Sequence, residues 1–261
     1  MSLHDAYART TPWELTFQSA EVARDFAAAV SEESEGRGAD PEVPEAFLTM
    51  GAVDHFIRGL EGADDAEGAL ARFGGLVYHA HHFTNAGCPV FLLSVHAARY
   101  LVGGAPSGSP KPPAPSGYLQ FPQHLFWVVG ASPGDTPESI DGLFWTVTSA
   151  GVLHSMLVTG LRPDRPGIGV VPLPSAPIED AVLWVGIEGR GEGADFSAAL
   201  PGGELDGLYG IASAGEVFKL LARFFAYAEG VPDALEAMKP ETESGTPEAS
   251  SLPFMRVTLS V

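Results

Sequence analysis

The amino-acid sequence predicts a soluble α+β protein in which a mainly antiparallel sheet packs with helices. Short apolar runs between residues 121 and 188, separated by Gly, Pro, Asp and Ser, are typical of strands joined by turns. Longer segments upstream have apolar residues every three or four positions, as on the buried stripe of a helix. A chain of 261 residues is long enough for one large domain. We therefore expect a single domain over 1–261, with a helical part at 1–102, a proline-rich linker at 103–117 and a sheet-rich part at 118–261.

Composition argues against several classes of partner. The chain has a formal net charge of −19 and only 14 Lys and Arg residues. Nucleic acid and anionic membranes need a basic surface, so neither is an expected partner. Cys88 is the single cysteine, which excludes an internal disulfide framework and a multi-cysteine zinc site. The sequence shows no N-terminal signal pattern and no apolar run of membrane-spanning length, so we expect a cytoplasmic protein, and its Ala, Gly, Pro and Arg content indicates a bacterial source.

The N-terminal segment has two interpretations. Apolar and polar residues alternate over 13–17, which predicts a half-buried strand. Alternatively, Thr11-Pro12-Trp13-Glu14 has the form of a capping box with proline at the first helical position, and it would begin a helix. We favour the strand. Ser19 is then expected to cap a helix whose inward apolar residues recur at four-residue spacing: Val22, Phe26 and Val30.

Three further helices are expected before the linker. Residues 44–60 carry one apolar stripe, with His55 and Arg58 on the opposite side. A second helix follows a pair of aspartates and ends at Gly87. Residues 88–102 are apolar enough for either a buried helix or a strand. Their length, a proline near the start and the glycines that follow favour the helix.

A hairpin centred on Ala150 predicts the register of the central strands. Turn-forming residues flank this position and connect two strand-like runs. One face of the hairpin then collects apolar side chains, while Thr146, Thr148 and His154 share the other. The paired residues would be Val147 with Leu153, Trp145 with Ser155, and Leu143 with Leu157.

The remainder of the chain is expected to complete the sheet and add one helix. Prolines over 162–177 permit only a short edge strand, at 169–171. A Gly-rich acidic loop is expected at 188–210, followed by a helix at 214–228 that begins with a capping box from Ser213. After the helix we expect a mobile acidic loop at 229–251 and then a strand at 255–261, which would lie beside residues 13–17.

Histidines provide the candidate functional residues. On a helix, His79 and His82 lie three positions apart and share a face, so their imidazoles could bind one divalent metal ion such as zinc, with His55 as a third ligand. Alternatively, these histidines lie at a helix end where their charge is favourable; the absence of an H-E-x-x-H pattern favours this second interpretation. In the sheet, His154 beside Thr146 is a candidate ligand-binding pair for a small anion, or a general base.

Function is constrained by what the sequence lacks and by its aromatic residues. No nucleophile elbow, phosphate loop or calcium loop is present, and Cys88 is interpreted as a buried small residue. Adjacent aromatic residues such as Phe144 and Trp145 must face opposite sides of the sheet. If helices cover one face only, the other exposes an aromatic surface for a homodimer; if they cover both, that surface becomes core.

The leading hypothesis is a non-enzymatic binding or assembly protein that self-associates, has a protein or small-molecule partner and needs no cofactor. The alternative is a metal-dependent hydrolase or metal-binding protein.

Overall fold

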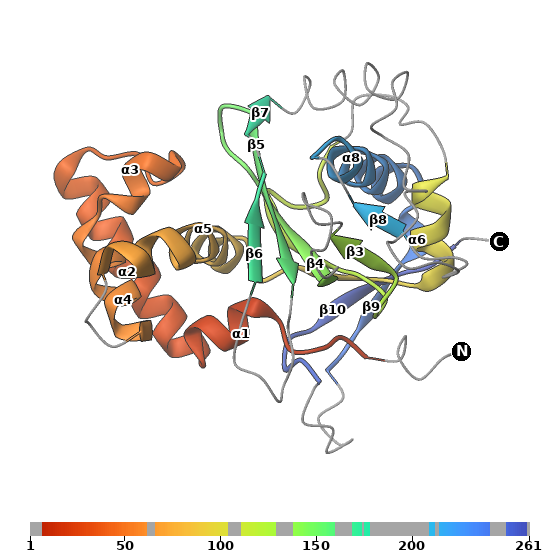
Figure 1. Cartoon of the computed structure of the whole chain (residues 1–261), viewed down its shortest axis with the longest axis horizontal. Helices are drawn as coiled ribbons and strands as arrows, with labels where there is room; N and C mark the ends of the chain where they lie inside the picture. Colours follow the sequence, from red (N-terminus) through yellow and green to blue (C-terminus); the bar gives the residue numbers. More distant parts are fainter. Residues whose placement is uncertain are drawn as a thin grey trace.

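The protein consists of a mixed sheet covered by helices on both faces (Figure 1). The computed structural model describes residues 7–61, 66–103, 111–128, 138–159, 169–173, 175–177, 209–211, 214–240 and 249–259. The predicted α+β class is confirmed, and most strand pairs are antiparallel. Among the described helices, none is long and apolar enough to cross a membrane.

Five helices lie on one side of the sheet, in two tiers. Helix α5 packs directly on the sheet, and the other four pack around it (Figure 1). This arrangement buries α5 on both its sheet side and its outer side. The helices are α1 (Pro12–Phe17), α2 (Ala20–Arg37), α3 (Pro44–Leu48), α4 (Gly51–Glu61) and α5 (Ala66–Asn85).

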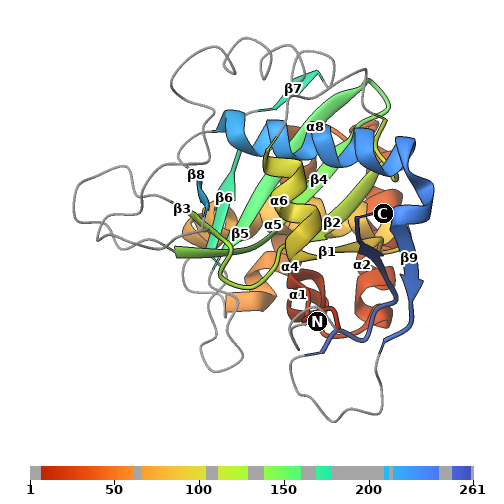
Figure 2. The same ribbon diagram turned by 90° about the vertical axis from the view of Figure 1, so that its right-hand side faces the viewer.

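The opposite face of the sheet is covered by α6 (Val95–Val102) and α8 (Ala214–Gly230), which cross in front of the strands in Figure 2. The predicted helix at 214–228 is therefore confirmed, whereas Ser213, its predicted cap, lies outside the described residues. Because helices cover both faces, the predicted aromatic surface is core: Phe144 and Trp145 are both fully buried. The sheet face proposed for a homodimer is thus not available.

The sheet runs in the order β6-β5-β4-β2-β1-β10-β9, with β3, β7 and β8 beside this path. The predicted hairpin is confirmed at every pair, because Val147, Trp145 and Leu143 lie opposite Leu153, Ser155 and Leu157. The strands are β1 (Val90–Leu93), β2 (Ser116–Gln120), β3 (Phe126–Val128), β4 (Glu138–Val147), β5 (Val152–Thr159), β6 (Gly169–Pro172), β7 (Ala176–Pro177), β8 (Tyr209–Ile211), β9 (Leu235–Met238) and β10 (Phe254–Val257).

The predicted strand at 13–17 is wrong, and the capping-box alternative is correct. The Thr11 hydroxyl accepts a hydrogen bond from the Glu14 N–H, and the Glu14 carboxylate accepts one from the Thr11 N–H at 2.7 Å. The same carboxylate also accepts hydrogen bonds from the Ser250 and Ser251 hydroxyls. The capping box of Thr11 and Glu14 therefore begins α1, and Glu14 attaches the helix to the segment that leads into β10. A local cap of this kind outweighs a short alternating pattern.

Two further predictions need correction at β1. Residues 88–102 were expected to form one helix, but they form β1 and then α6, because Ser94 caps a new helix immediately after the strand. The C-terminal strand is confirmed over Phe254–Val257, but its partners are β1, in parallel, and β9, not residues 13–17. The parallel β1 lies at the centre of the sheet and is buried throughout, which accounts for its continuous apolar sequence.

Smaller corrections concern the ends of elements. The helix expected over 44–60 is two helices, α3 and α4, and strand β2 begins inside the expected linker. Strand β9 lies within the predicted mobile loop at 229–251. The apolar run at 181–187 and most of the loop at 188–210 lie outside the described residues.

Candidate functional site

Helix α5 positions the predicted histidines inside the protein. His79 faces the sheet and is only 4% exposed, because α5 is packed against strands on that side. His81 points the other way, where its ring lies 5.3 Å from that of Phe47 on α3. His82 is half-buried beside the segment between α2 and α3. The sequence predicted that His79 and His82 share one side of the helix, and in the structure protein covers that side.

A chain of hydrogen bonds connects His79 to the sheet. The Ser116 hydroxyl donates to the Trp145 carbonyl at 3.0 Å, and it lies 3.1 Å from the Thr146 hydroxyl. Each hydroxyl has one hydrogen, so Thr146 must donate to Ser116. Thr146 is then left to accept from His79, whose Nδ1 lies 3.1 Å away. The geometry therefore assigns the proton of neutral His79 to Nδ1.

Tyr78 lies among three imidazoles. Its ring centroid is 5.3 Å from that of His79, 4.6 Å from that of His82 and 5.6 Å from that of His154. The Tyr78 hydroxyl donates to the Glu42 carbonyl at 2.7 Å. The His82 Nε2 donates to the Pro41 carbonyl at 3.1 Å, because a carbonyl can only accept. The phenol ring of Tyr78 therefore occupies the centre of this cluster.

Burial keeps these imidazoles neutral. It lowers the pKa of His79 and of His81 to about 3, and the pKa values of His82 and His154 are also lowered. The pKa of Glu42 is lowered mainly by its hydrogen bond from the Ser149 hydroxyl. The cluster thus combines uncharged imidazoles with an ionised carboxylate at its edge.

The structure brings together most of the predicted site residues, but not as one metal site. His79, His82, His154 and Thr146 belong to the same cluster, whereas His55 is exposed on α4. Within the part of the chain that the structure describes, no three His, Cys, Asp or Glu side chains are grouped so that they could hold a metal ion.

Cys88 lies between the end of α5 and the start of β1, so it does not begin a helix. Its side chain is half-buried, and burial, followed by the charge of Glu14, raises the pKa of the thiol to about 11. A thiol with this pKa is protonated at neutral pH and is a poor nucleophile.

A shallow hollow of about 280 Å³ lies on the outer surface between α1, α2 and α4, and we call it the α1–α2–α4 hollow. Its lining is Thr16, Phe17, Gln18, Val22, His55, Phe56, Gly59 and Leu60. Val22, predicted to face inward, is 43% exposed, and Leu15 on the neighbouring α1 is 47% exposed. The inward stripe of α2 is instead formed by Ala23, Phe26 and Val30.

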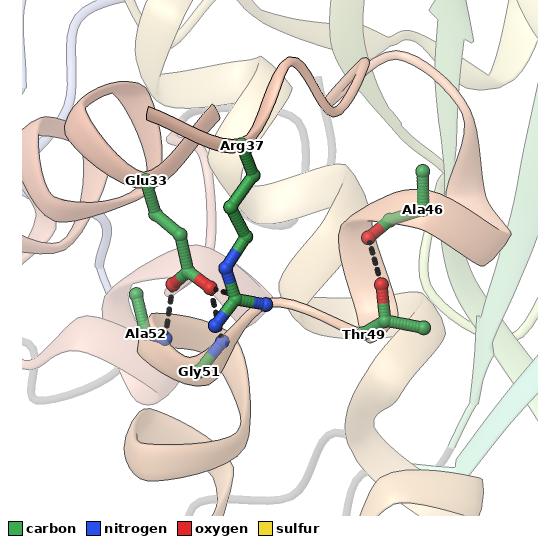
Figure 3. Close-up of polar contacts among 6 residues, drawn as sticks. All are labelled: Glu33, Arg37, Ala46, Thr49, Gly51 and Ala52. Atoms are coloured by element: carbon green, nitrogen blue, oxygen red, sulfur yellow. Dashed lines mark hydrogen bonds and ion pairs between the residues drawn. The ribbon is translucent and has the colours of Figure 1, made fainter. Parts of the chain in front are cut away.

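The relative position of α2 and α4 is set by a cap from a neighbouring helix (Figure 3). The Glu33 carboxylate on α2 accepts hydrogen bonds from the N–H groups of Gly51 and Ala52, at 2.7 and 2.8 Å, where α4 begins. Arg37 forms an ion pair with the same carboxylate at 3.0 Å. The hydrogen bonds from Ala52 and Gly51 lower the pKa of Glu33. This cap holds the two long walls of the hollow in place, and the sequence contains no local signal for it.

Comparison with known proteins identifies no relative: no family model matches this chain, and no curated protein or solved structure is significantly similar to it.

Proposed function

We propose that this protein is a non-enzymatic binding or assembly protein that self-associates through the α1–α2–α4 hollow. The observation that carries the proposal is the apolar surface at this hollow, where the exposed Val22 lies beside the half-buried Phe56 and Leu60. Exposed apolar surface that is contiguous, unlike single scattered residues, commonly marks a protein interface. This surface takes the place of the sheet face, which is buried within one chain.

The lining of the hollow suits pairing between two copies. On the α4 wall, Arg58 already forms an ion pair with Asp54 at 2.7 Å, so this pair adds no net charge beside the hollow. A two-fold axis through the hollow would bring its apolar lining against the same lining of a second copy, as a self-complementary interface requires.

The hydrogen bonds within the histidine cluster support a non-enzymatic function. The His79 Nδ1 and His82 Nε2 atoms are used in hydrogen bonds to protein groups, and Ser116 and Thr146 are buried. A general base needs contact with a substrate proton. The hydroxyls and His79 stabilise the contact between α5 and the sheet, and His82 connects α5 to the segment between α2 and α3.

A pair of matched variants tests the proposed surface by light scattering. Val22 and Val43 are equally exposed at 43%, but only Val22 lines the hollow. We expect the natural chain and Val43→Asp to show about twice the mass of one chain, and Val22→Asp to show the mass of one chain. A natural chain that stays monomeric at about 100 μM, or a Val22→Asp variant that remains dimeric, would contradict the proposal.

Elemental analysis of the same untagged samples separates this proposal from the metal-dependent alternative. About one zinc, manganese or iron ion per chain, lost in His79→Ala, would support the alternative. A metal-free dimer would support the binding or assembly function.

A further inference from the structure

Helix α6 presents a basic and aromatic stripe on the face of the protein opposite the histidine cluster. His96, Arg99 and Tyr100 are exposed and lie at positions i, i+3 and i+4, so they share one side of the helix. Tyr100 is 51% exposed, which is the largest fraction among the exposed large apolar and aromatic side chains of the described residues. The other side of α6 is buried in the core.

Helix α8 holds the exposed tyrosine in place. The Arg223 guanidinium lies 5.4 Å from the centre of the Tyr100 ring and donates to the Leu101 carbonyl at 2.7 Å. The Tyr227 ring lies 5.5 Å from that of Tyr100, and its hydroxyl donates to the Thr258 carbonyl. Tyr100 is thus both accessible and preorganised, which lowers the entropic cost of binding to it. Figure 2 shows α6 and α8 side by side on this face.

The charge of this surface differs from that of the whole chain. The segment Val95–Val102 contains no Asp or Glu, although the chain as a whole has a net charge of −19. Arg99 makes no ion pair with any residue that the structure describes. Tyr and Arg are the residue types that dominate binding energy at protein interfaces.

We propose that this surface, formed by His96, Arg99, Tyr100, Arg223 and Tyr227, binds an acidic segment of a partner protein. Carboxylates of the segment would pair with the Arg99 and Arg223 guanidiniums, and an apolar or aromatic side chain would lie on Tyr100. A protein segment fits better than nucleic acid, because a chain with a charge of −19 repels a long polyanion. The inference does not depend on the α1–α2–α4 hollow.

The test uses a fluorescent peptide of alternating Glu and Leu with one Trp, its Gln-for-Glu counterpart and an oligothymidylate, measured by fluorescence anisotropy. We expect the acidic peptide to bind, and its affinity to fall by about tenfold or more in Tyr100→Ala and Arg99→Glu. Arg24→Glu, on α2, changes the net charge equally and should alter affinity less than about twofold. Light scattering and circular dichroism confirm that each variant remains folded.

Four results would overturn the inference. The acidic peptide could fail to bind at accessible concentrations, or it could bind no better than its Gln counterpart. Arg24→Glu could weaken binding as much as Arg99→Glu, which would show a general charge effect. Tighter binding of the oligothymidylate would identify the surface as a nucleic-acid site.

Discussion

The two faces of the sheet bury neighbouring residues of β4 in different surroundings. Trp145 points towards α8, where its ring lies 5.8 Å from that of Phe224 and 5.5 Å from that of Phe225. Phe144 and Thr146 point towards α5, where His79 and Ser116 complete a polar chain. One face is thus stabilised by aromatic packing, and the other by packing and hydrogen bonds together. Alternation of apolar and polar residues along a strand therefore need not mean that one face is in water.

The largest expected effect is on the aromatic face. Trp145→Ala removes a fully buried side chain that contacts α8 and Phe91, and we expect the free energy of unfolding to fall by about 3–5 kcal/mol. Urea denaturation followed by circular dichroism measures this change. A loss below about 1 kcal/mol would show that α8 does not depend on this residue.

Acid is expected to weaken the packing around α5, which contacts the sheet through His79 and the outer helices through His81. The pKa values of His79 and His81 are about 3 in the folded protein, below the ordinary 6.5, so the unfolded chain binds protons first. Their stabilising contribution is present above pH 6.5 and is lost as pH falls towards 3. Over this range the free energy of unfolding falls by up to about 1.4 kcal/mol per pH unit for each histidine.

His81→Leu is the variant that tests the acid effect. His81 Nδ1 is buried and, among the described residues, has no hydrogen-bond partner. Replacing it should change the free energy of unfolding at pH 7 by less than about 1.5 kcal/mol, because the new side chain suits the surrounding aromatic rings. The decrease in the free energy of unfolding between pH 6.5 and pH 4 should be smaller than in the natural chain. An unchanged slope would mean that His81 does not resist protonation.

The last prediction compares one hydroxyl on each face. Thr146→Val leaves the His79 Nδ1–H without its acceptor and should cost about 1–3 kcal/mol of unfolding free energy. Ser155 faces the aromatic side, is buried and has no hydrogen-bond partner among the described residues. Ser155→Ala should therefore leave stability unchanged or raise it. Equal losses in the two variants, measured by urea denaturation at pH 7, would remove the distinction between the faces.

Local sequence patterns were sufficient to predict an element where the residues that determine it are close in sequence. The β4–β5 register follows from the turn at Ala150 and from alternation on either side, and all three predicted pairs are present. The helix at α8 follows from a long apolar arc. At 13–17, the capping box of Thr11 and Glu14 is the local signal that determines the helix, and the alternating pattern that predicts a strand does not.

The candidate site was predicted only in part, because its geometry depends on the second tier of helices. Periodicity could place His79 and His82 on one side of α5, but it could not show that Tyr78 lies between them and His154. The hollow was not predicted, since exposure of Val22 depends on where α4 lies. That position is set by the Glu33 cap, whose donors are 18 and 19 residues away in sequence.

The sequence by itself determined the α+β class, the central hairpin and most of the helices, because turns, caps and apolar periodicity act over a few residues. Tertiary structure decided that helices cover both sheet faces, that β1 pairs in parallel with β2 and β10, and that His79 and His81 of α5 are buried. These features depend on contacts between segments far apart in the chain. A helix with apolar residues on one side and histidines on another has the same sequence pattern whether water or a second layer of protein covers the histidines.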